Sequence, residues 1–365
     1  MLGGFFLNIV NNSKKRILYL DSLRVLAIVC VVLMHVSTRF NVNVANFDIS
    51  ALINAFIRVG IPLFFMVSGA LLIGKSNENF ISRRFNRILK PYIFWVIVYF
   101  LVGILLFNGT FSLNYFLDIL LVKASITTHF WFIYCLLGGY LLIPIVNGYL
   151  KIEKDKGLKY LLVLLLLCTV LTSLDKFVDL NVSQFKIIFI NLPFLKTPLF
   201  YFVIGYYLNN KKFNISNKKL VLISIILIAI GYVLELFYLH TSNHGFKFPD
   251  ATFLLNYHLI IESIGVFIFF KYFDLTLISS KLNSLSNNRL IPIVRNISGC
   301  SFGIYFVHYV IIKYLFEKGH LFYQFTVGKA YIWIPVTFLA VFLFSWFIIY
   351  LMSKVPILKI GSGFK

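Results

Sequence analysis

Acidic residues are scarce in this chain of 365 residues, which has 13 Asp and Glu against 34 Lys and Arg. Charged residues of both signs make up 13% of the sequence, about half the share of a typical soluble domain. Hydrophobic residues account for 60%. A soluble enzyme needs a polar surface that this composition does not supply, so we expect a membrane protein.

Cysteine is scarce as well, and each copy stands alone inside an apolar segment. The four cysteines are Cys30, Cys135, Cys168 and Cys300. Their spacing matches neither a disulfide framework nor a zinc site. We therefore expect no metal and no disulfide, and we interpret these residues as small hydrophobic core residues.

Three further features are missing from the sequence. It has no Gly-rich phosphate loop of the Walker or dinucleotide type, which argues against nucleotide hydrolysis. It has no internal repeat, which is the usual signature of a secondary transporter. Its polar stretches are too short to hold a soluble domain. We expect a cytoplasmic N-terminal segment at residues 1–16, a membrane domain at residues 17–352 and a cytoplasmic C-terminal tail at residues 353–365.

Ten apolar runs are long enough, or nearly so, to cross a bilayer as helices. The alternating pattern of membrane β-strands is absent. The expected fold class is therefore all-α, a polytopic membrane protein with about ten transmembrane helices. The expected spans are residues 17–37, 51–73, 88–107, 129–149, 158–174, 189–208, 219–239, 251–270, 297–316 and 330–352.

The net charge of +21 is distributed unevenly along the chain. If the N-terminus is cytoplasmic, the cytoplasmic stretches hold 23 of the 34 Lys and Arg residues. This bias is the positive-inside pattern, and it predicts that both termini are cytoplasmic. Topology and attraction to anionic lipids explain the charge, so we do not expect nucleic acid as a partner.

The first apolar segment carries an arginine and a histidine eleven positions apart. Arg24 and His35 are expected on one face of a helix, about 16 Å apart along its axis, because eleven residues complete about three turns. Ionisable side chains within a membrane are costly and usually functional. Asp21 precedes Arg24 by one turn and is expected to hold its guanidinium group. A purely structural ion pair is the alternative.

Further motifs follow in order along the chain. Residues 58–69 read RVGIPLFFMVSG, residues 83–91 RRFNRILKP, residues 129–134 HFWFIY, residues 201–207 YFVIGYY and residues 301–308 SFGIYFVH. Together with the spacing of Arg24 and His35, they make essentially the whole chain resemble the acyltransferase-3 family. The resemblance is strongest to stand-alone members without a fused esterase-like domain. The family contains integral-membrane O-acyltransferases of bacterial surface glycans, typically with ten spans and acetyl-CoA as the donor.

The resemblance implies a chemistry for the first segment. Transfer of an acyl group from a thioester to a hydroxyl needs a base, and it needs positive charge or donors for the developing oxyanion. His35 is the expected base, because imidazole titrates near neutral pH. Arg24 is expected to position the donor, with Asp21 fixing the orientation of its guanidinium group.

A basic motif is expected to bind the donor. Arg84 and Arg87 lie one helical turn apart, and guanidinium groups bind phosphates of the kind found in coenzyme A. Arg83 and Lys90 are expected to support them. The alternative is that all four residues are ordinary positive-inside charge.

A second set of residues is expected to contact the acceptor or the oxyanion. It comprises Arg58, His129, Trp131, Ser301, Tyr305 and His308. Arg58 is expected at the depth of His35, although snorkelling to the outer headgroups explains it nearly as well. His258 and Glu262 lie four residues apart and are expected to pair in a supporting role.

The leading hypothesis is a multi-pass enzyme of the bacterial plasma (inner) membrane. It moves an acetyl or other short acyl group from cytoplasmic acyl-CoA to a hydroxyl of a surface or lipid-linked glycan, with the lipid bilayer around it. The alternative is a transporter or flippase for a lipid-linked saccharide, whose intramembrane charges line a translocation path. The sequence leaves open the acceptor, the acyl group, the side on which the ester forms, covalent acylation of His35 and the oligomeric state.

Overall fold

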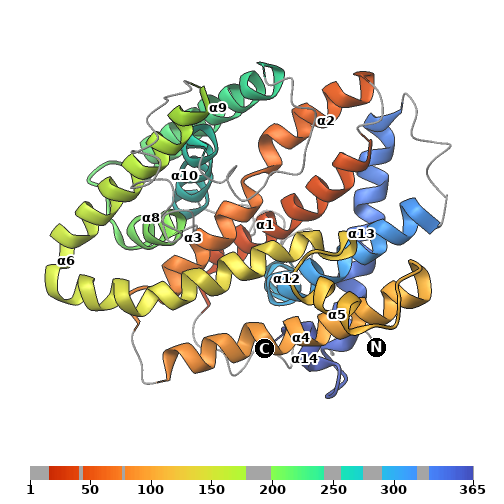
Figure 1. Cartoon of the computed structure of the whole chain (residues 1–365). Helices are drawn as coiled ribbons and strands as arrows, with labels where there is room; N and C mark the ends of the chain where they lie inside the picture. The colour runs from red at the N-terminus through yellow and green to blue at the C-terminus, as the bar shows by residue number, and fades with distance from the viewer. Residues whose placement is uncertain are drawn as a thin grey trace.

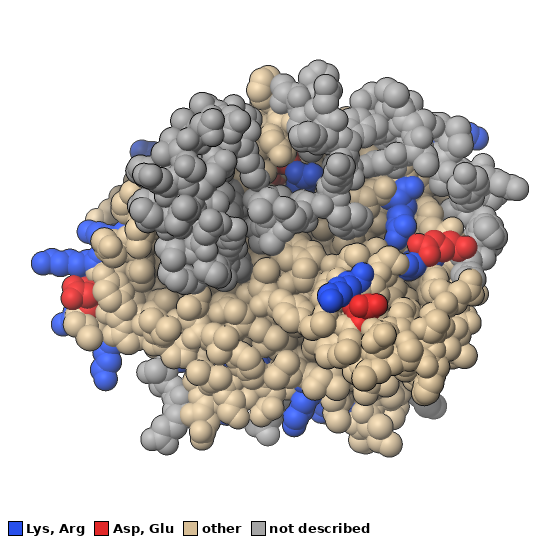
Figure 2. Space-filling model, viewed as in Figure 1, with Lys and Arg blue, Asp and Glu red and all other residues tan. Residues whose placement is uncertain are grey.

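A computed structural model describes residues 16–40, 44–75, 79–177, 199–241, 256–273, 290–318 and 329–364. Every regular element in these ranges is helical, which confirms the all-α fold class. The helices form a single bundle that Figure 1 shows from the side. Residues other than Lys, Arg, Asp and Glu, drawn in tan, make up most of the described surface in Figure 2. Helices α9 and α13 expose large hydrophobic side chains such as Val233, Phe237 and Phe347. These faces suit a lipid environment.

The bounds of the elements are as follows. They are α1 (Leu18–Ser37), η2 (Thr38–Phe40), α2 (Val44–Ile57), α3 (Gly60–Leu72), α4 (Phe80–Leu106), α5 (Leu113–Leu120), η3 (Ser125–Phe130), α6 (Trp131–Phe177), α8 (Leu199–Asn210), α9 (Asn217–Thr241), α10 (Tyr257–Tyr272), α12 (Leu290–Lys313), η6 (Tyr314–Lys318), α13 (Ala330–Met352) and α14 (Lys359–Ser362). The η2 and η3 segments are 3₁₀ turns, and η6 is a π-helical turn.

Seven helical segments among the described residues are long and apolar enough to cross a membrane. Two of the ten expected spans, 129–149 and 158–174, are joined in α6, which kinks at Lys154 with φ of 49°. Two others, 189–208 and 251–270, lie partly outside the described residues. The total of ten spans and the cytoplasmic position of the termini therefore stay predictions.

The expected span 51–73 is broken into α2 and α3 at Arg58 and Val59. Pro62 explains the break, because a proline ring clashes with the carbonyl four residues earlier, which belongs to Arg58. Proline is tolerated in the first turn of a helix, and Pro62 lies in the first turn of α3. The break places Arg58 at a helix discontinuity inside the bundle, where it is 6% exposed.

Two glycine-containing motifs meet where α3 crosses α8. A Cβ atom on Gly69 would lie 1.9 Å from the backbone oxygen of Phe202, and one on Gly205 would lie 2.1 Å from that of Met66. Only glycine permits this backbone approach. The structure therefore explains why both motifs carry glycine: each glycine allows the other helix to pack against its backbone.

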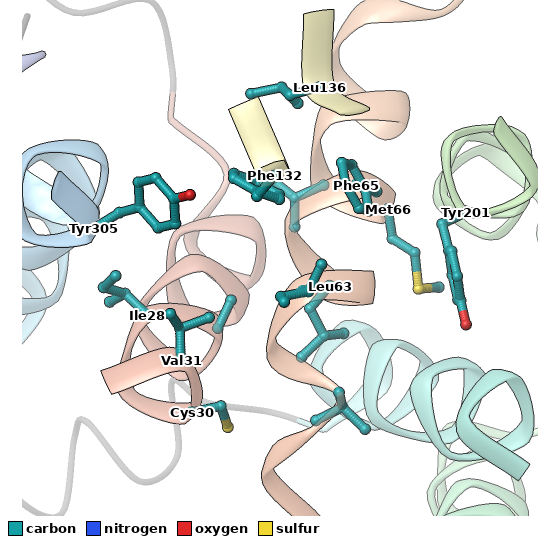
Figure 3. Close-up of a cluster of buried hydrophobic side chains, with 14 of the residues drawn as sticks. Ile28, Cys30, Val31, Leu63, Phe65, Met66, Phe132, Leu136, Tyr201 and Tyr305 are labelled. Atoms are coloured by element: carbon teal, nitrogen blue, oxygen red, sulfur yellow. The ribbon is translucent and has the colours of Figure 1, made fainter. Parts of the chain in front are cut away.

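Helix α1 runs through the middle of the bundle, where it packs against α3, α12 and α13 (Figure 1). Figure 3 shows Ile28 and Val31 of α1 beside Leu63 of α3, in a cluster that also holds Phe132 of α6. Leu23, Ala27 and Ile28 are completely buried. This apolar packing holds α1 in place, so the positions of Arg24 and His35 are set by the core of the protein.

Candidate active site

Three histidines from separate elements come together at one end of α1. His35 belongs to α1, His129 to η3 and His308 to α12. The ring centroid of His35 lies 5.2 Å from that of His308 and 6.2 Å from that of His129, and the latter two are 5.6 Å apart. All three are buried, with exposed fractions of 4%, 2% and 0% in chain order. The fold therefore unites three residues that the sequence placed in different motifs.

Tyrosine side chains surround this histidine cluster. Tyr309 stacks on His129 at 4.6 Å and meets His35 edge-on at 5.3 Å. Tyr305 lies with its ring centroid 5.6 Å from that of His129, and its hydroxyl donates to the His129 carbonyl. Tyr99 of α4 completes the contacts, with its hydroxyl 3.3 Å from His129 Nε2. Sequence reasoning missed Tyr99 and Tyr309, although Tyr309 directly follows the predicted His308.

The histidine cluster does not have the geometry of a metal site. Within the ranges that the structure describes, no group of three or more His, Cys, Asp or Glu side chains is arranged to hold a metal ion. The side chains at the cluster are imidazole and phenol groups, which exchange protons and accept or donate hydrogen bonds.

Arginines gather around the other catalytic candidate of α1. Arg24 lies within electrostatic range of Arg87 on α4, Tyr140 on α6 and Arg16 before α1. Arg87 also interacts with Arg84 and Arg16. We call Arg16, Arg24, Arg84 and Arg87 the arginine cluster. Arg24 faces α4 and α6, and His35 faces His129 immediately before α6, so the two residues lie on a common side of α1.

The carboxylate expected to hold Arg24 has other partners. Asp21 Oδ1 accepts hydrogen bonds from Arg16 Nη2 at 3.1 Å and from Ser298 Oγ at 2.7 Å, while its Oδ2 has no hydrogen-bond partner in the described chain. The expected Asp21–Arg24 ion pair is therefore corrected. Asp21 links the start of α1 to α12 through Ser298, and it attracts Arg24 electrostatically without a hydrogen bond to it.

The remaining residues of the basic motif lie along the first turns of α4. Arg84 packs over the ring of Phe80 at 5.7 Å from its centroid. Arg83 and Lys90 are exposed. Arg87 is exposed as well, but it lies within electrostatic range of Arg24 and of Arg84, so the structure brings these two members of the predicted donor-binding set together with Arg24.

Arg58 takes part in a buried ionic network with side chains of α9 and α10. Its Nη1 donates to Glu235 Oε1 of α9 at 2.5 Å, and Glu235 Oε2 lies 2.5 Å from His258 Nε2 of α10. Both partners of Arg58 in this chain of contacts are 1% exposed. A cation already paired with a carboxylate is poorly placed to stabilise an oxyanion. The network instead ties the α2–α3 break to α9 and α10.

The expected pair of His258 and Glu262 is also corrected. His258 binds Glu235, and neither carboxylate oxygen of Glu262 has a hydrogen-bond partner among the described residues. Glu262 is fully buried against Gly231 of α9, whose Cβ position would lie 2.5 Å from Glu262 Cβ. A carboxyl group in such a setting is favoured in its neutral form. Glu235 was the partner that sequence spacing did not reveal, because it lies on a different helix.

Two further predicted acceptor residues lie on the elements that carry the cluster. Ser301 Oγ donates to the Ser298 carbonyl of its own helix at 2.9 Å. Trp131 begins α6, two residues after His129, and is partly buried. The structure thus assigns a local helical bond to Ser301 and leaves Trp131 near the cluster.

Comparison with known proteins identifies the family to which the chain belongs. Searches found no match among curated proteins and none among solved structures. A family model described as an acyltransferase domain matches residues 17–351, which contain α1, the histidine cluster and all but Arg16 of the arginine cluster. The protein therefore belongs to the acyltransferase-3 family and is a membrane acyltransferase.

Proposed function

We propose that this acyltransferase moves an acetyl or other short acyl group from cytoplasmic acyl-CoA to a hydroxyl of a surface or lipid-linked glycan in the bacterial plasma membrane. One observation carries the proposal: α1 contributes Arg24 to the arginine cluster and His35 to the histidine cluster, on a common side of the helix. The two residues are about 16 Å apart along the helix axis.

The arginine cluster supports an anionic donor. Like charges held close together repel one another, and a bound anion offsets that repulsion. The phosphates of coenzyme A would bind Arg84 and Arg87 through charge-assisted hydrogen bonds. Arg24, which forms no hydrogen bond with Asp21 Oδ1, would then direct the thioester arm along α1 toward His35.

The histidine cluster supports proton transfer from the acceptor. His35 takes the proton from the attacking hydroxyl, whose oxygen forms a bond to the thioester carbonyl carbon. The carbon–sulfur bond then breaks, the thiolate of coenzyme A leaves, and the proton held by His35 restores the thiol or passes to solvent. The product is an ester on the glycan.

The test compares surface glycans by mass spectrometry from cells that produce the wild-type protein and from cells that produce His35→Ala. We expect acyl esters on the glycan with the wild type and their loss with the variant at equal protein level. If ester content is unchanged and export of the glycan falls instead, the protein handles the glycan as a transporter and the proposal is wrong.

A further inference from the structure

The tautomer of His308 follows from its hydrogen bond. Its Nδ1 lies 3.1 Å from the backbone carbonyl oxygen of Ile304, one turn earlier in α12. A carbonyl oxygen only accepts hydrogen bonds, so Nδ1 carries the proton and donates it. In a neutral imidazole the other nitrogen then carries the lone pair. His308 Nε2 is therefore a hydrogen-bond acceptor.

The tautomer of His129 follows by the same reasoning and is the opposite one. The Tyr99 hydroxyl donates its only proton to the Phe306 carbonyl at 2.7 Å, and its oxygen lies 3.3 Å from His129 Nε2. Since the tyrosine proton is already used, His129 Nε2 must donate to the tyrosine oxygen. His129 Nδ1 is therefore left as the acceptor.

Both acceptor atoms are buried and have no hydrogen-bond partner within the described part of the chain. Tyr305 donates its hydroxyl proton to the His129 carbonyl. Tyr309 stacks on the face of the His129 ring, and its hydroxyl accepts hydrogen bonds from Arg39 and Thr128. A buried acceptor without a donor is unfavourable, and such groups in native proteins call for a specific explanation. The explanation must supply at least two O–H or N–H donors beside His35.

We propose that His129 Nδ1 and His308 Nε2 bind two hydroxyl groups of the acceptor that flank the one deprotonated by His35. This inference rests on the proposed function and narrows its acceptor to a polyhydroxylated ring with free hydroxyls next to the reacting one. The sequence left open whether His129 and His308 contact the acceptor or the oxyanion, and their tautomers decide between these two roles. Lone pairs repel a developing oxyanion, so these two residues bind the acceptor and do not form an oxyanion hole.

Amide side chains test this assignment with opposite predictions at the two positions. At position 308, Gln places its amide group near Nε2 and supplies an acceptor oxygen, whereas Asn reproduces only the Nδ1 donor to Ile304. At position 129 the relation is reversed, because Asn supplies an acceptor near Nδ1 and Gln reproduces only the donor to Tyr99. Retained binding is therefore expected in His308→Gln and His129→Asn, and lost binding in His308→Asn and His129→Gln. A purely structural role predicts the reverse order at both positions.

The assay uses purified full-length protein, radiolabelled acetyl-CoA and the glycan-lipid fraction extracted from membranes of producing cells. We expect His308→Asn and His129→Gln each to raise the acceptor KM by about tenfold, the effect of one lost buried hydrogen bond, with the acetyl-CoA KM unchanged. Equal effects of Asn and Gln at each position, or the reversed order, would overturn the proposal. A wild type that transfers nothing to any glycan fraction would instead overturn the proposed function.

Nitrogen NMR of protein labelled on histidine gives a second measurement that does not depend on activity, and it needs only variants that fold well enough to assign the resonances. We expect His308 to carry its proton on Nδ1 and His129 on Nε2, with the resonances assigned from the loss of one signal in each variant. The addition of the glycan-lipid fraction should shift the unprotonated nitrogens. A proton on His308 Nε2 or on His129 Nδ1 would contradict the proposal.

Discussion

At the scale of single residues, the arginine cluster places four cations around one carboxylate that has other partners. Asp21 forms its hydrogen bonds with Arg16 and Ser298 and attracts Arg24 only electrostatically, and the electrostatic partners of Arg87 include no carboxylate among the described residues. Guanidinium groups suit planar, bidentate binding of phosphate, which lysine does not provide. A binding site for an anionic donor explains this arrangement better than structural pairing.

We predict that Arg87→Gln raises the acetyl-CoA KM by about tenfold or more, because it removes a charge-assisted hydrogen bond to phosphate. Lys90→Gln is the matched control, since Lys90 lies on the same helix and is exposed. Steady-state release of coenzyme A gives both values. Equal KM values for Arg87→Gln and Lys90→Gln would show that the motif is ordinary positive-inside charge.

The buried network of Arg58, Glu235 and His258 stabilises the folded protein. Removal of one partner leaves a charge buried without compensation, so Glu235→Gln is expected to destabilise the protein by about 3–5 kcal/mol. Glu317→Gln is the control, because Glu317 is 42% exposed and its pairs with Arg39 and Lys313 are 3.8 and 3.6 Å long. That substitution should cost about 1 kcal/mol or less. Thermal unfolding in detergent measures both, and equal midpoints would refute the role assigned to the network.

At the scale of elements, hydropathy and periodicity in the sequence predicted the apolar helices and the residues that share a helix face. The apolar runs identified the described helices, and the spacing of Arg24 and His35 placed both on one side of α1. The break before α3 depends on a proline that hydropathy ignores. The Asp21 and His258 partners lie on other helices, so spacing along one helix gave the wrong pairs. The meeting of His129 with His308 depends on how η3 packs against α12, which no local pattern encodes.

The crossing of α3 and α8 gives a prediction at this scale. Gly69→Ala places a methyl group 1.9 Å from a backbone oxygen, so the helices must separate, at an expected cost of about 3 kcal/mol or more. Gly148→Ala is the control, because its Cβ would meet nothing within 4 Å and alanine favours the helix by about 1 kcal/mol. We expect a lower unfolding midpoint for the first variant and an unchanged or higher one for the second. Similar midpoints would show that α3 and α8 do not cross at this glycine.

At the scale of the whole molecule, the proposal requires the arginine cluster to face the cytoplasm and the histidine cluster to open toward the outer side. Helix α4 offers a test, because its N-terminal end carries Arg84 and Arg87 and its other end leads to Thr110. We predict that a maleimide that does not cross membranes labels Thr110→Cys in intact cells and labels Ser82→Cys only after lysis. The native cysteines give a low background, since Cys30, Cys168 and Cys300 are buried. Labelling of Ser82→Cys in intact cells would invert the orientation.

The central claim is that α1 separates two tasks, donor binding near Arg24 and proton transfer at His35. The most direct test measures acetyl-CoA binding by calorimetry and acyl transfer on the same purified His35→Gln protein. The account predicts wild-type affinity for acetyl-CoA and a transfer rate lowered by about 10²–10⁴-fold, the usual contribution of a general base. Transfer at the wild-type rate, or a loss of binding as large as the loss of transfer, would contradict it.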